Sequence, residues 1–137
     1  LIRTPVAGTY AWRTYGAHWV QLDAPRHLTI HSEDSMRMLA DQEGFAVDRV
    51  WYDSTGFQFW GSRRYVEGRD LSSQFGRPGV SRAERRERRL QDFAAEVLNR
   101  DAQGDQACFI LSRLADSLGS GESVARADLS GATRDLH

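Results

Sequence analysis

The stretch Ser32–Tyr52, SEDSMRMLADQEGFAVDRVWY, decides the fold class, because it joins a clearly marked helix to a strand. Ser32 is a good N-cap residue, since its hydroxyl can accept a hydrogen bond from an unpaired N–H of the first turn. Gly44 is expected just after the last turn, and the β-branched and aromatic residues of 45–52 predict a strand. The buried stripe of the helix is predicted at spacings of three and four residues, by Met36, Leu39 and Ala40.

Two further strands and two further helices are expected around this unit. Residues 1–4 and 106–111 are predicted strands, and Pro5 ends the first because it cannot continue a central strand. Residues 6–15 favour a short helix that Gly16 would end. A second clear helix starts at Ser81, which forms a capping-box pattern with Glu84. Its apolar face consists of Leu90, Phe93, Ala94, Val97 and Leu98.

The segments between these elements carry weaker signals. Residues 57–66 are rich in aromatic side chains and have no clear period, and Gly68–Gly79 favours an irregular loop. Residues 114–137 form a tail with few large apolar groups, which predicts disorder. The order is therefore strand, helix, loop, helix, strand, irregular insert, helix and strand, which suits the last third of an open α/β sheet.

Length and composition restrict the class of protein. A chain of 137 residues is enough for one domain, and its first residue is Leu1 rather than Met, so we expect a fragment of a longer protein. The net charge of -1 gives no long-range attraction for nucleic acid or an anionic membrane. One cysteine, Cys108, fits a reducing cytosol and is expected to be an inert core thiol. No apolar run approaches the ~20 residues needed to cross a bilayer.

The segment between the first two helices gathers several reactive side chains. Residues 19–28 read Trp-Val-Gln-Leu-Asp-Ala-Pro-Arg-His-Leu, with an aromatic ring, a carboxylate, a guanidinium and an imidazole within ten residues. Side chains of this kind, held in a loop between regular elements, are typical of a binding or catalytic site.

This loop, Tyr15-Gly16-Ala17-His18-Trp19 running into Leu22-Asp23-Ala24-Pro25-Arg26-His27, resembles that of class I S-adenosylmethionine-dependent methyltransferases. The similarity is to the C-terminal half of the bacterial branch labelled methyltransferase type 11, 12 or 23. It extends over residues 1–113 and includes the strand exit at 1–5, the helix with Gly44-Phe45, and residues 104–109.

The resemblance implies the end of a Rossmann-like sheet. Residues 1–4 would be its fifth strand, 45–52 its sixth, and 106–111 an antiparallel seventh strand inserted between them. The glycine-rich loop and the acidic residue that hold the cofactor in this family are not in the chain. The S-adenosylmethionine cofactor would therefore be bound mainly by a missing N-terminal half, and this chain alone would be inactive.

The implied activity is cytoplasmic transfer of a methyl group to a small-molecule or glycan-type acceptor. Ligands of open α/β sheets bind beyond the carboxyl ends of the strands, so the loop after the first strand would face the acceptor. His27 is the candidate general base, because an imidazole titrates near neutral pH; alternatively, it braces the loop together with Arg26. The residues expected to bind substrate are Tyr15, Trp19, Asp23 and Arg26.

Each of these substrate residues also has a structural alternative. Asp23 and Arg26, three positions apart, suit a local ion pair that shapes the turn. Tyr15 and Trp19 would either line an acceptor pocket or pack against the sheet. No metal site is predicted, because the histidines and Asp23 lack a recognised ligand spacing.

The alternative function is a non-catalytic, methyltransferase-like binding or interaction module. The five arginines of 81–89 raise the separate possibility of a phosphate-binding patch, but Glu84 and Glu87 within the same turns favour an ordinary solvated helix surface.

Overall fold

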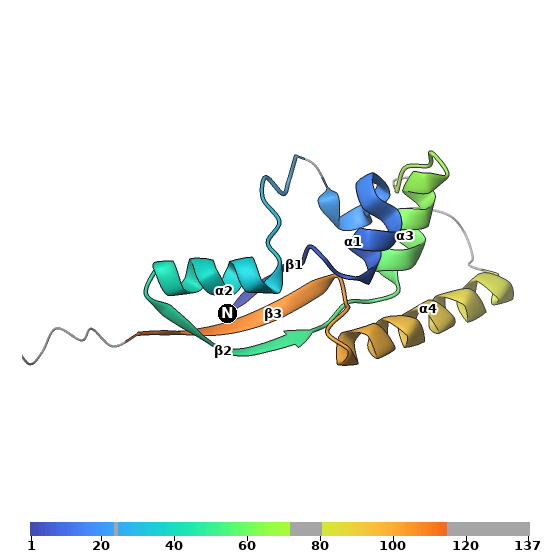
Figure 1. Ribbon diagram of the computed structural model, residues 1–137. Helices are drawn as coiled ribbons and strands as arrows, with labels where there is room; N and C mark the ends of the chain where they lie inside the picture. Colours follow the sequence, from blue (N-terminus) through green and yellow to red (C-terminus); the bar gives the residue numbers. More distant parts are fainter. Residues whose placement is uncertain (24, 72–80, 115–137) are drawn as a thin grey trace, which may run out of the picture.

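A computed structural model describes residues 1–23, 25–71 and 81–114 and contains one three-stranded sheet (Figure 1). The strands are β1 (Ile2–Pro5), β2 (Phe45–Tyr52) and β3 (Gln106–Arg113), in the order β1-β3-β2. β3 runs antiparallel to both neighbours, so β1 and β2 are parallel to each other. This is the strand order predicted for residues 1–4, 106–111 and 45–52, and the α/β class is confirmed.

Helix α2 (Glu33–Gln42) covers one face of the sheet (Figure 1). Ser32 caps it as predicted, because its hydroxyl accepts a hydrogen bond from the Ser35 N–H at 3.1 Å. Gly44 follows with a φ of +75°, a conformation that glycine adopts without strain. The stripe prediction is wrong for Leu39, which is 38% exposed. The core under α2 consists of Val6, Met36, Ala107 and Phe109.

The first predicted helix is shorter than expected. Helix α1 spans Tyr10–Tyr15, and Gly16 ends it as predicted. Val6 is not helical, because it forms a parallel bridge with His31 and is buried in the core. Two single-turn 3₁₀ helices follow, η1 (Gly16–His18) and η2 (Val20–Leu22).

The aromatic segment, whose form the sequence leaves undecided, is helix α3 (Phe57–Val66). It lies beside α1, at the end of the sheet where β1 and β2 finish (Figure 1). Its buried residues are mainly small or polar, namely Gln58, Gly61, Ser62 and Arg64. Gly61 is needed for close packing, because a Cβ atom there would approach Val20 and Phe57 to 2.8 Å.

Helix α4 spans Arg82–Arg100 and begins with the predicted capping box of Ser81 and Glu84. Its apolar face, however, does not pack on the sheet. The structure leaves Leu90 61%, Phe93 63% and Val97 41% exposed. The helix is attached through polar groups instead: the carboxylate of Asp92 accepts the Gly56 N–H at 2.9 Å, and the Asn99 amide donates to the Ser54 carbonyl at 2.9 Å.

The predicted tail 114–137 lies outside the described residues except for Leu114, and so does most of the loop predicted at Gly68–Gly79. Within the part of the chain that is described, no helix combines the length and apolar character needed to cross a membrane.

Candidate functional site

The carboxyl ends of β1 and β2 lie at the same edge of the sheet, because both strands run antiparallel to β3. Ligands of open α/β sheets bind at such an edge. Here it is formed by Asp53 after β2, by Val6 after β1, and by Asp105 just before β3. The helices α1 and α3 gather beyond this edge (Figure 1). We therefore take the edge and the loop above it as the candidate site.

Asp53 is the centre of a polar cluster on this edge. Its carboxylate accepts hydrogen bonds from the Arg3 Nε at 2.6 Å and from the Gln106 amide at 3.0 Å. Burial alone would raise the pKa of Asp53, but these bonds outweigh it and hold the pKa below its ordinary value. Asp53 is therefore ionised at neutral pH and can accept a hydrogen bond from a ligand hydroxyl or amine.

Cys108 lies against the same carboxylate, with its sulfur 3.5 Å from an Asp53 oxygen. The thiol is buried, as predicted. Burial raises its pKa, and the negative charge of Asp53 raises it further. A thiol that keeps its proton is a poor nucleophile, so covalent catalysis by Cys108 is disfavoured.

Asp105 is a second carboxylate at this edge, and it is almost completely buried. It accepts a hydrogen bond from the indole Nε1 of Trp19 at 2.9 Å. Burial raises the pKa of Asp105, and the hydrogen bonds from Trp19 and Ser54 offset only part of that rise. The contact fixes the loop after α1 to the start of β3.

The raised pKa of Asp105 predicts a pH-dependent effect of Asp105→Asn. Asp105 keeps its proton to a higher pH in the folded chain than in the unfolded chain, so its contribution to stability falls as the pH rises above about 4. Asparagine removes this titration and still offers an oxygen to Trp19. The free energy of unfolding of Asp105→Asn relative to the wild type should therefore increase with pH, which urea unfolding at a series of pH values measures.

Asp53→Asn is the matched control for that experiment, because the pKa of Asp53 is shifted in the opposite direction. The ionised Asp53 contributes stability above its unfolded pKa and loses it on acidification. The relative stability of Asp53→Asn should therefore decrease as the pH rises. If the relative stabilities of the two variants changed with pH in the same direction, or did not change, the assignment of opposite pKa shifts would be contradicted.

The predicted site residues of the loop occupy different environments. Trp19 is fully buried and packs edge-on against Trp12, with ring centres 5.5 Å apart. Its ring presents no surface to an acceptor, which favours the packing alternative. Tyr15 is half-buried at the end of α1. Burial raises its pKa, and the nearby charge of Arg63 opposes this.

Asp23 and Arg26 form the predicted local ion pair, with 3.2 Å between the Arg26 Nε and an Asp23 oxygen. Asp23 adopts a left-handed conformation with a φ of +34°, which fits a tight turn. His27 is half-buried, and neither ring nitrogen makes a hydrogen bond to any described residue. Apart from the Asp23–Arg26 pair, the described contacts do not join the predicted site residues to one another.

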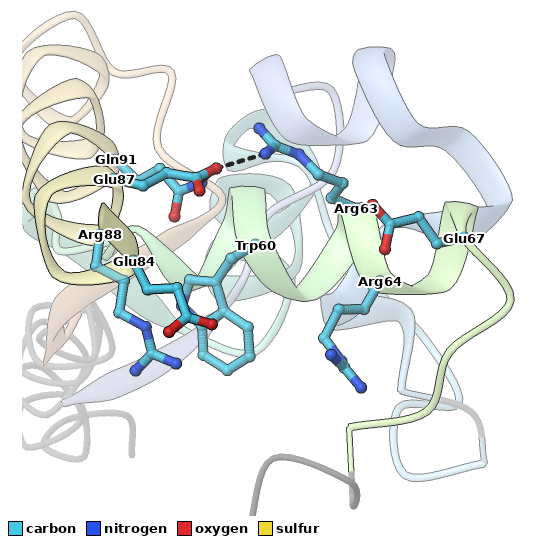
Figure 2. Close-up of a pocket in the computed structure, with 8 residues that line it drawn as sticks. All are labelled: Trp60, Arg63, Arg64, Glu67, Glu84, Glu87, Arg88 and Gln91. Carbon is cyan, nitrogen blue, oxygen red and sulfur yellow. Dashed lines mark hydrogen bonds and ion pairs between the residues drawn. The ribbon is translucent and has the colours of Figure 1, made fainter. Parts of the chain in front are cut away.

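A cavity of about 180 Å³ lies between α3 and α4, and Figure 2 shows the side chains around it. Arg63 of α3 pairs with Glu87 of α4 at 2.6 Å, and the Arg88 guanidinium lies 5.4 Å from the centre of the Trp60 ring (Figure 2). The lining contains three arginines and three glutamates, so it has no excess charge to attract an ion. We interpret this cavity as part of the packing between the two helices.

A second cavity, of about 470 Å³, lies beside the carboxyl end of β2. Its size falls within the range of small-molecule sites. The Tyr52 hydroxyl donates to Glu33 at 2.7 Å, and burial together with this contact raises the pKa of Tyr52. The cavity thus offers one aromatic wall and several charged groups. Its lining is formed by Glu33, Arg37, Val50, Trp51, Tyr52, Asn99, Arg100 and Ala102.

The sequence singled out the loop but missed Asp53, Asp105 and the second cavity. The two carboxylates could have been found from their positions in the sequence. Asp53 directly follows one predicted strand, and Asp105 directly precedes the next. Within the described residues, no group of three or more His, Cys, Asp or Glu side chains is arranged to hold a metal ion. Comparison of the chain with models of protein families, with curated proteins and with solved structures found no match.

Proposed function

We propose that this chain forms the acceptor side of an S-adenosylmethionine-dependent methyltransferase that acts on a small-molecule or glycan-type acceptor. The strand arrangement carries the proposal. Two parallel strands, β1 and β2, enclose the antiparallel β3, which is the order implied by the resemblance of the loop at residues 15–27. Such an order requires β3 to enter the sheet between two strands formed earlier in the sequence, so a simple meander of hairpins would not produce it.

The described turns do not fit the cofactor. A glycine-rich turn binds a cofactor through free backbone N–H groups. At the turns after β1 and β2, the N–H groups of Val6, Ala7, Ser54 and Gly56 already donate to other groups of the chain at 2.9–3.0 Å. Under this proposal another segment of the protein holds S-adenosylmethionine, and the present residues bind and orient the acceptor.

On the acceptor side, the chain would align the acceptor with the methyl group and supply a general base. A hydroxyl or amine acceptor must lose a proton when it is methylated, and a positioned base assists that step. His27 fits this role in one respect, since its imidazole has no hydrogen-bond partner among the described residues. The Asp23–Arg26 pair and the buried Trp19 would hold the loop in place on either side of the acceptor.

The test is binding and transfer by the protein produced from its complete gene. Isothermal titration with S-adenosylmethionine should show binding, and radiolabelled cofactor should pass its methyl group to a member of a panel of small hydroxyl, amine and sugar acceptors. The 137-residue chain should bind the cofactor at least about 100-fold more weakly, a loss of roughly 2.7 kcal/mol. Absence of cofactor binding by the complete protein would reject the proposal and favour the non-catalytic binding module.

A further inference from the structure

The exposed apolar side of α4 is a feature that the proposed function does not use. We call Leu90, Phe93 and Val97 the α4 stripe. Spacings of three and four residues place the three side chains on one side of the helix. They are 61%, 63% and 41% exposed, whereas the buried residues of this helix are Gln91 and Ala95. The helix thus faces the rest of the chain with one side and presents a separate apolar side to solvent.

Polar contacts fix the orientation of the helix, so the α4 stripe cannot turn inward without breaking them. In the first half of the helix, Glu87 pairs with Arg63 of α3 at 2.6 Å. In the middle, Asp92 accepts the Gly56 N–H, and in the last turn the Asn99 side chain both accepts from and donates to the Ser54 backbone. A contiguous apolar surface held outward in this way is typical of a protein–protein contact.

The charges beside the α4 stripe indicate which protein it fits. Arg89 and Glu96 are seven residues apart, so they lie on the same flank of the helix, and Phe93 neighbours both. Both are exposed, and neither forms an ion pair with another described residue. The first half of the helix is basic, with five arginines and two glutamates in 82–89, whereas Asp92 and Glu96 make the second half more acidic.

We infer that the α4 stripe pairs with the same stripe of a second copy of this chain, with the two helices antiparallel about a two-fold axis near Phe93 and Ala94. This arrangement sets Leu90 opposite Val97 of the second copy. It also brings Arg89 within about 3 Å along the axis of Glu96 of the second copy, given a rise of about 1.5 Å per residue. A two-fold axis repeats each contact, so two apolar pairs and two ion pairs form. A parallel pair would instead place the Arg89 side chains of the two copies on opposite sides of the contact, so Arg89 would not meet Glu96 of the second copy.

Sedimentation velocity of the chain over a wide range of concentrations tests this inference. The wild type should change from monomer to dimer as its concentration rises and should go no further, because a two-fold contact is closed. Phe93→Glu should weaken the dimer by about 30-fold or more, as expected for a central interface residue. Its melting temperature, measured at concentrations where both proteins are monomers, should remain near that of the wild type because Phe93 is exposed.

Met38→Glu is the matched control. Met38 is 64% exposed on α2, so this variant introduces the same charge at an equally exposed apolar position outside the α4 stripe. It should dimerise like the wild type. A wild type that stays monomeric, assembly that grows beyond the dimer, or equal weakening by Met38→Glu and Phe93→Glu would overturn the inference.

A charge exchange tests the antiparallel direction and does not depend on Phe93. Arg89→Glu and Glu96→Arg should each weaken the dimer, and the double variant Arg89→Glu/Glu96→Arg should restore it, because the exchanged charges again meet across the axis. The antiparallel arrangement would be overturned if the single variants dimerised like the wild type, or if the double variant formed a weaker dimer than either single variant. The inference concerns assembly and holds whether or not the chain takes part in methyl transfer.

Discussion

Trp19→Ala is expected to lower the free energy of unfolding by about 3–5 kcal/mol, the usual cost of removing a fully buried tryptophan. Two losses combine in this variant. Removing the ring leaves a cavity in the buried site and takes away the edge-on contact with Trp12 at 5.5 Å. The buried carboxylate of Asp105 also loses the indole donor at 2.9 Å. Urea or thermal unfolding followed by circular dichroism measures the change, and a large part of the chain's total stability should be lost.

Two companion variants separate the contributions. Trp12→Ala removes a ring of the same size from a partly exposed position and should cost only about 1 kcal/mol. Trp19→Phe keeps most of the packing but removes the donor to Asp105, which predicts a loss of about 1–3 kcal/mol. Equal effects of Trp12→Ala and Trp19→Ala would show that Trp19 is not the anchor of this loop.

Under the proposed function, His27→Ala should lower the turnover number of methyl transfer by about 100- to 10,000-fold if the imidazole is the general base. The affinity for S-adenosylmethionine should stay the same, because the proposed cofactor site lies on another segment. The melting temperature should also change little, since the ring makes no hydrogen bond to any described residue. Single-turnover transfer and calorimetric titration measure the two quantities separately.

His18→Ala is the control for that experiment, because His18 lies in the same loop region but is exposed at the end of η1. It should retain the turnover of the wild type. A loss of activity in His27→Ala that only follows a loss of melting temperature would identify His27 as a structural residue. This result would leave open the proposed transfer reaction, which the binding and transfer experiment tests independently.

The elements that the sequence predicted well have local causes. Ser32 and Ser81 each cap a helix through atoms three residues away, and the strand at 45–52 follows from β-branched and aromatic residues that are adjacent in the chain. The strand order was predicted through the resemblance of the loop, because no spacing within 1–4 or 106–111 specifies a neighbouring strand.

Elements that depend on distant packing were predicted poorly. The helical periodicity of α3 could not be recognised from the sequence, because its buried side consists largely of Gln58, Gly61 and Ser62 rather than large apolar groups. The Ser62 hydroxyl accepts the Val20 N–H at 3.0 Å, a contact between segments far apart in sequence. The apolar face predicted for α4 is also largely exposed, because polar groups rather than that face attach the helix to the fold.

The candidate site was predicted only in part for the same reason. The Asp23–Arg26 ion pair spans three residues and could be predicted from its spacing. The bonds of Asp53 to Arg3 and of Asp105 to Trp19 join residues that are 50 and 86 positions apart in the sequence. Both bonds depend on the register of the sheet, in which Arg3 lies opposite Cys108. No spacing within the two strand sequences specifies this register.

The central position of β3 also has a consequence for synthesis on the ribosome. β1 is synthesised well before β3, its partner in the sheet, since Ile2 lies opposite Phe109. Among the described strands, β2 likewise pairs only with β3. Closing such long loops is entropically costly, and sheets built from distant segments form slowly. While the chain emerges from the exit tunnel, α2 can form early, but β1 and β2 must wait for residues 106–113, so their edges stay unpaired during that time.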